Sequence, residues 1–269
     1  MDYFVNYNYE EEYDCSPVDK SKYCTRLMYL IIKCHDAEVV RNYLLEQEHQ
    51  EEINIRNEKG WSALMLASIF GNYHHNTLIV RILLGHNADV NLCSFDGYSV
   101  LMYAAMYSAS CSNIETLRLL LKNGANVNLR GNEGRSALMM AALYIGTCSS
   151  VESLRLLLKN GADVNLRDNR GKSALMMIVQ YTHTYSSVES LRLLLKNGAD
   201  VDLRDNSGWT ALMMAVQYTG TYNNVKSLRL LLKNGANVNA HDNNGWTALM
   251  LAVVNSVHRR IIDRVRLLL

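Results

Sequence analysis

Cysteine and histidine are the residues of this chain that could carry nucleophilic or metal chemistry. The six cysteines are Cys15, Cys24, Cys34, Cys93, Cys111 and Cys148. They form no CxxC pair and show no ligand spacing with histidine, so the sequence predicts neither a metal site nor a disulfide framework. The neighbouring His74 and His75 are better explained as surface residues, because adjacent loop residues rarely chelate one metal. We therefore expect no metal, and thiols that stay reduced.

Motifs for catalysis are also missing from the sequence. It contains no GxxxxGK, GxGxxG, HExxH or GxSxG, and its potential catalytic residue types recur as periodic rows instead of forming one unique group. We expect a protein that is not an enzyme and takes no cofactor and no small-molecule substrate.

Composition narrows the class of partner. A net charge of +1 provides no overall attraction to nucleic acid or to an anionic membrane. No stretch approaches the roughly 18 apolar residues of a membrane span, and the acidic, aromatic N-terminus does not resemble a signal peptide. With 49% hydrophobic residues the chain can fold. We predict a cytoplasmic protein that binds neither nucleic acid nor membrane.

Self-similarity is the strongest feature of the sequence. Glycines recur every 37 residues at Gly60, Gly97, Gly134, Gly171, Gly208 and Gly245. Methionines keep the same step at Met65, Met102, Met139, Met176, Met213 and Met250. A fixed period of this length indicates stacked structural repeats, which must position every candidate functional residue.

Each period divides into two helices and a turn. Residues 210–216 (TALMMAV) predict a short buried helix whose leading Thr can cap free N–H groups. Residues 225–232 (VKSLRLLL) place apolar residues on one helical face, and the following Asn234-Gly235 predicts a helix end with positive φ. Residues 165–171 (NLRDNRG) predict a hairpin-like turn, since Asn, Asp and Gly favour turns.

The stretch NGADVNLRDNRGKSALMMIV at residues 160–179 resembles the ankyrin repeat. The resemblance recurs six times and covers about residue 54 to the end. It implies an all-α ankyrin-repeat solenoid of stacked helix pairs with β-hairpin-like turns. The expected organisation is an acidic, Tyr-rich leader at 1–20, an N-terminal capping helix pair at 21–53, and six repeats of 37 residues at 54–269, the last incomplete. The long-loop repeats without Pro are similar to those of ankyrin proteins from amoeba-infecting giant viruses. Bacterial effectors of the same hosts are the alternative.

Two departures separate these repeats from the family pattern. The family has Pro-Leu-His where this chain has Ala-Leu-Met, so a helix-forming Ala replaces Pro and an apolar Met replaces a hydrogen-bonding His. The family period is about 33 residues. Alignment places the four additional residues between the two helices, where we expect longer loops.

A stacked repeat exposes an extended surface, and the resemblance implies that the partner is a protein met by the turns and the first helices. The residues that follow the repeat Gly are Trp61, Tyr98, Arg135, Lys172, Trp209 and Trp246. The first helix ends at Tyr107, Tyr144, Tyr181 and Tyr218, and the turn tips carry Arg130, Arg167 and Arg204. Aromatic and Arg side chains dominate binding hot spots, so these rows are the candidate site.

Alternatives stay open for two of the rows. The Tyr row either binds a partner or packs against the longer loops. Arg also recurs along the second helices, and such a row of cations could bind nucleic acid. However, Glu115, Glu152 and Glu189 each precede an Arg by three residues, a spacing that permits pairing on the same helix. This face is therefore better explained as a solvated outer surface.

The sequence thus predicts a non-catalytic scaffold that binds a host or viral protein through a concave aromatic and Arg surface. Alternatives are an adaptor that recruits substrates to a ubiquitin ligase and a structural component of a virion. The resemblance also implies possible hydroxylation of Asn165 by a host enzyme. The chain ends at Leu269 inside an expected helix, so we expect this end to pack on further repeats or on another chain.

Overall fold

The computed structural model describes residues 25–34, 36–69, 76–108, 111–145, 149–180, 185–217 and 222–254. The acidic leader, Tyr181, Tyr218, the His74-His75 pair and the end of the last repeat lie outside these ranges.

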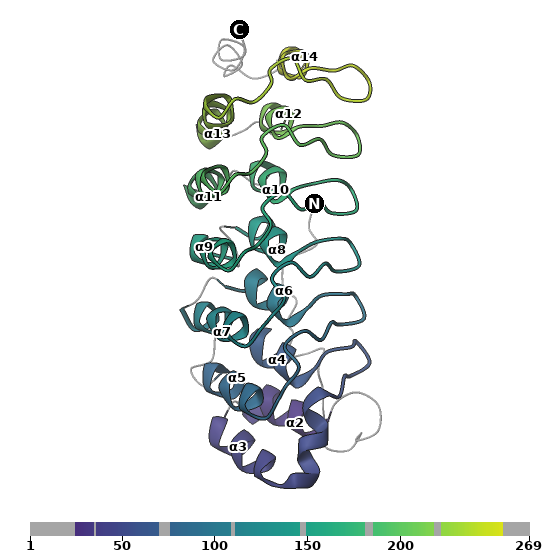
Figure 1. Ribbon diagram of the computed structural model, residues 1–269, viewed down its shortest axis with the longest axis vertical. Helices are drawn as coiled ribbons and strands as arrows, with labels where there is room; N and C mark the ends of the chain where they lie inside the picture. The colour runs from purple at the N-terminus through teal and green to yellow at the C-terminus, as the bar shows by residue number, and fades with distance from the viewer. Residues whose placement is uncertain are drawn as a thin grey trace.

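Helix pairs stack in one column, with the second helices along one side and the turns along the other (Figure 1). The first helices are α4 (Ala63–Ile69), α6 (Val100–Met106), α8 (Ala137–Leu143), α10 (Ala174–Gln180), α12 (Ala211–Gln217) and α14 (Ala248–Val254). The second helices are α5 (Asn76–Gly85), α7 (Cys111–Lys122), α9 (Val151–Lys159), α11 (Tyr185–Lys196) and α13 (Tyr222–Lys233). This arrangement confirms the predicted all-α solenoid.

Before the first repeat lie α2 (Arg26–Tyr29), the π-helical η1 (Leu30–Cys34), α3 (Ala37–Leu45) and the 3₁₀ helix η2 (Gln47–Asn54). Glu52 of η2 joins these elements, because its carboxylate accepts hydrogen bonds from the Leu27 N–H and from the Tyr43 hydroxyl, each at 2.9 Å. Burial, together with the bond to Glu52 and the charge of that carboxylate, raises the pKa of Tyr43, so the phenol stays a donor.

The first helices begin at Ser or Thr, as predicted for the helix that follows Thr210. The Ser99 hydroxyl accepts a hydrogen bond from Met102 N at 3.2 Å, and Thr210 accepts one from Met213 N at 3.4 Å. Ala or Val then occupies the first helical position, where the family pattern has Pro. The hydroxyl satisfies one otherwise free N–H, so the helix starts without Pro.

The hydrophobic core runs along the whole stack, between the first helices and the second helices. Five of the six periodic methionines lie in this core: Met65, Met102, Met139, Met176 and Met213 are at most 1% exposed, whereas Met250 in α14 is 51% exposed. Within the described ranges, no helix combines the length and the hydropathy needed to cross a membrane.

Candidate protein-binding surface

The turns before α10, α12 and α14 are each closed by hydrogen bonds around an Asp side chain. In the turn between α9 and α10, Gly171 N donates to Asp168 O at 2.9 Å, and the Asp168 carboxylate accepts from Arg170 N and from Lys172 N at 2.9 and 2.7 Å. Asp205 and Asp242 repeat this arrangement in the next two turns. The carboxylate therefore fixes the backbone of the residue after the repeat Gly, which belongs to a predicted binding row.

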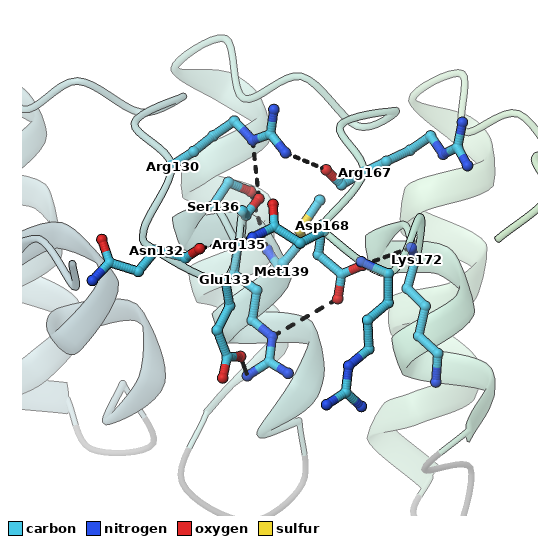
Figure 2. A network of polar contacts seen from close by, with 12 residues as sticks. Arg130, Asn132, Glu133, Arg135, Ser136, Met139, Arg167, Asp168 and Lys172 are labelled. Carbon is cyan, nitrogen blue, oxygen red and sulfur yellow. Dashed lines mark hydrogen bonds and ion pairs between the residues drawn. The ribbon is translucent and has the colours of Figure 1, made fainter. Parts of the chain in front are cut away.

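The turn-tip arginines fasten each turn to the next one. Arg130 donates from Nε to Gly134 O at 3.0 Å and from Nη2 to Arg167 O at 2.7 Å (Figure 2). Arg167 and Arg204 make the same pair of bonds one repeat further on. These contacts explain why Arg recurs at the tip, a structural role that the residue pattern does not indicate.

A row of amides makes a second connection between repeats. Asn165 accepts from Asp200 N through Oδ1 at 2.8 Å and donates from Nδ2 to Gly198 O at 3.1 Å. Asn91 and Asn128 do the same in their repeats. Asp202 occupies this position in the next repeat and accepts from Asn237 N at 2.8 Å. A carboxylate has no N–H, so it can make only half of the connection.

Asp202→Asn is therefore expected to raise the free energy of unfolding by about 0.5–1.5 kcal/mol, because it adds a donor for the carbonyl of the next Gly. The reverse change, Asn165→Asp, should lower it by a similar amount. Both positions follow an Asp at the same spacing, which makes the two changes a matched pair. Urea titrations monitored by circular dichroism measure the difference; a gain in both variants, or in neither, would contradict this role.

The residues after the repeat Gly form one row along the turns, which we call the turn-edge row: Trp61, Tyr98, Arg135, Lys172, Trp209 and Trp246. The two ends of the row differ in exposure. Trp61 is 7% exposed, Tyr98 to Trp209 are partly buried, and Trp246 is 39% exposed. The row therefore offers its surface mainly from Tyr98 onward.

Trp61 is buried by an aromatic neighbour that sequence reasoning missed. Its ring centroid lies 5.3 Å from that of Tyr103, which in turn lies 5.8 Å from Tyr98 and donates its hydroxyl to Ser94 at 3.3 Å. The sequence does contain a signal for this contact, because Tyr103 occupies a periodic position at which the next repeat has the apolar Met140. The sequence predicts that Trp61 faces a partner, but these contacts make it part of the core.

The middle of the turn-edge row is charged. Arg135 forms an ion pair with Glu133 at 2.7 Å, and its buried Nε lies 3.9 Å from the Asp168 carboxylate (Figure 2). Lys172 donates to the Gln180 side chain at 3.1 Å. Figure 2 shows both cations extending away from the turn-tip arginines. They are therefore held by neighbours while remaining partly exposed.

Tyr98 lies beside this charged group. Burial, and then the charge of Glu133, raise the pKa of Tyr98. Its phenol is therefore neutral at physiological pH and can donate a hydrogen bond to a partner.

Tyr107 and Tyr144 end α6 and α8, half-buried and packed against the hydrophobic core. Of the two interpretations of the Tyr row, this placement favours packing for these two residues. Tyr181 and Tyr218 belong to the same row and lie outside the described residues.

The surroundings of Cys93 disfavour a reactive thiol. Burial, and then the charge of Asp89, raise the pKa of this thiol, which disfavours the reactive thiolate. In the part of the chain that is described, no three His, Cys, Asp or Glu side chains gather as metal ligands.

Comparison with known proteins agrees with this geometry. A family model of three consecutive ankyrin repeats matches residues 2–92, 27–130, 73–168, 138–242 and 175–269. Among curated proteins, the ankyrin repeat protein L91 of Acanthamoeba polyphaga mimivirus is 36% identical over 90 residues, which cover 31% of this chain and 14% of that protein. L86 of the same virus is 35% identical over 85 residues, 28% of this chain and 14% of the relative. The match thus spans only a small part of the length of these relatives.

Solved structures give the same fold. The ankyrin repeat domain of Bcl-3, a member of the IkappaB protein family, matches with a TM-score of 0.72 and 25% identity, covering 91% of this chain and 100% of that domain. An ankyrin repeat domain from Acinetobacter baumannii matches with a TM-score of 0.63 and 28% identity, covering 76% and 95% of the two chains. The chain therefore belongs to the ankyrin repeat family, whose domains are typically non-catalytic and generally serve as protein-binding scaffolds.

Proposed function

We propose that this chain is a non-catalytic scaffold that binds a host or viral protein through the turn-edge row, from Tyr98 to Trp246. The observation that carries the proposal is the fixed backbone of the row. Asp168, Asp205 and Asp242 hold Lys172, Trp209 and Trp246 at one equivalent position in successive turns. An ordered backbone loses little further freedom on binding, which favours affinity.

The residue types along the row suit a protein partner. Trp209 and Trp246 supply large apolar area with two rotatable bonds each, and Arg135 and Lys172 lie between them and Tyr98 along the row. The turn-tip arginines and the Tyr row stay secondary candidates, because their contacts within the solenoid already account for much of their recurrence.

Affinity capture of proteins from an Acanthamoeba lysate with this chain tests the proposal. This lysate is chosen because the virus that encodes the two relatives is named after Acanthamoeba polyphaga. We expect Trp209→Ala and Trp246→Ala together to lose a partner that the unaltered chain retains. Phe95→Ala is the matched control, because Phe95 is a turn aromatic with 58% exposure outside the turn-edge row. Thermal melts establish that all variants fold, and the partner is then purified and its binding remeasured.

Equal capture by the Trp variant would refute the turn-edge row as the binding surface. Recovery of ubiquitin-ligase subunits with the partner would support the adaptor alternative, and high copy number in purified particles would support the virion alternative. Hydroxylation of Asn165 is tested separately by mass spectrometry of the chain from host cells, where an unmodified Asn165 peptide would exclude it. Its amide already makes two connections between repeats.

A further inference from the structure

The second helices α5, α7, α9, α11 and α13 form the outer face of the stack, on the side away from the turns (Figure 1). Ion pairs connect neighbouring helices of this face, each between an Arg and the Glu 34 residues further along the chain. The pairs are Arg81–Glu115 at 2.8 Å, Arg118–Glu152 at 3.1 Å and Arg155–Glu189 at 3.7 Å. Three successive junctions thus place a carboxylate against the same Arg position.

These contacts correct the prediction of pairing within one helix. Of the predicted same-helix pairs, only Glu152–Arg155, at 3.1 Å, forms among the described residues. Glu152 therefore bridges its own helix and the preceding one. From α5 to α11, Arg and Glu side chains therefore form a connected network of ion pairs, as expected of a solvated face.

The network is interrupted between α11 and α13. The residue 34 positions after Arg192 is Lys226, so a cation stands where the three preceding junctions have Glu. Arg192 is exposed and forms no ion pair with the residues that the structure describes. Lys196, Arg229 and Lys233 are exposed on the same two helices.

Acidic side chains near this junction already have partners. Glu189 pairs with Arg155 on the preceding helix. In the turn after α11, Asp200 accepts from Asp202 N and Asp202 accepts from Asn237 N. The sequence places Asp263 at the same offset from Arg229, outside the described residues. The α11–α13 junction, defined by the exposed Arg192, Lys196, Arg229 and Lys233, therefore presents a cluster of positive charge.

We propose that the α11–α13 junction binds an acidic polypeptide segment, one carboxylate of which takes the position against Arg192 that Glu occupies in the preceding junctions. The chain itself shows that a carboxylate fits this Arg in this stacking geometry, because it supplies one at three junctions. This surface is distinct from the turn-edge row, so one scaffold can hold two partners on opposite sides.

The size of the junction favours a polypeptide over nucleic acid. It presents four exposed cations on two neighbouring helices, whereas affinity for nucleic acid grows with the number of phosphates neutralised along an extended groove or face. The net charge of +1 adds no long-range attraction for a polyanion. Exposed ion pairs are individually weak and screened by salt, so the complex should be salt-sensitive.

Fluorescence anisotropy with a labelled peptide of six Glu residues tests this surface, with a peptide of six Gln residues as the control probe. The protein is the full chain with Glu10, Glu11 and Glu12 changed to Gln, so that its own acidic segment cannot compete. In this background, Lys226→Glu restores the internal carboxylate at Arg192 and is expected to weaken Glu-peptide binding about tenfold. Thermal stability should be unchanged or higher, which separates lost binding from lost folding.

Two further variants complete the test. Lys226→Arg keeps the charge and should keep binding within about twofold, and Arg81→Gln alters a junction that already has its carboxylate and should also leave binding unchanged. Absence of Glu-peptide binding, equal binding of the Gln peptide, or insensitivity to Lys226→Glu would overturn the proposal. Tighter binding of an oligothymidine, lost in the same Lys226→Glu variant, would overturn it in favour of nucleic acid.

Discussion

Replacement of Gly171 by Ala is expected to lower the free energy of unfolding by about 3 kcal/mol or more. The residue has a φ of +79°, which costs an L-amino acid about 1–2 kcal/mol. An added Cβ would also lie 2.5 Å from Asn206 Oδ1, 2.6 Å from Arg167 Nη2 and 2.7 Å from Asn206 N. These atoms belong to the connections between turns, so relief of the overlap would break them.

Gly198→Ala provides the matched control for this variant. Gly198 has a φ of +84°, and an added Cβ there would meet no atom within 4 Å. Its replacement should therefore cost only the free energy of placing an L-amino acid at positive φ, about 1–2 kcal/mol. Guanidinium titrations of both variants isolate the cost of crowding between repeats. Equal destabilisation would show that the turns do not stack as tightly as the structure indicates.

Met176→Ala is expected to lower the free energy of unfolding by about 2–4 kcal/mol. The Met176 side chain is 1% exposed among the stacked first helices, so its removal leaves a cavity between repeats. Met250→Ala removes the same group at the equivalent position in α14, where Met250 is 51% exposed. Because little burial is lost there, we expect a cost below about 1 kcal/mol.

Thermal and chemical unfolding, followed by circular dichroism, compare the two Met variants. Repeat proteins gain stability from each interface between neighbours, so Met176→Ala should also reduce the cooperativity of unfolding by weakening a central interface. Similar costs at Met176 and Met250 would argue against stacking as the reason for this periodic apolar row.

Several features of the site could be predicted from the sequence because they depend on local chemistry. The sequence predicts that Thr210 caps its helix, and the Thr210 hydroxyl accepts the backbone N–H of Met213. Gly235 was expected to take positive φ, and its φ is +85°. Such features follow from the conformations that one side chain and its neighbouring backbone allow.

Other roles could not be assigned, since they depend on residues a whole repeat away. Trp61 and Trp246 share one sequence position, but Tyr103 buries the first while the second remains exposed. The sequence predicts Arg167 as a binding residue, and only the stacked turns show that it also donates a hydrogen bond to Arg204 O in the next turn. Only the stacking distance and register decide which of these side chains meet.

The sequence by itself determined the period, the helices and turns, and the ankyrin fold, because repeated apolar spacing, caps and glycines act within one repeat or between identical neighbours. The tertiary structure alone decided which periodic residues connect repeats and which remain at the surface. It also showed that Glu115 and Glu152 pair with the Arg of the preceding helix, so that Lys226 interrupts a network. The physical reason is that burial and ion pairing depend on the distance between side chains on different repeats, which periodicity along the chain does not specify.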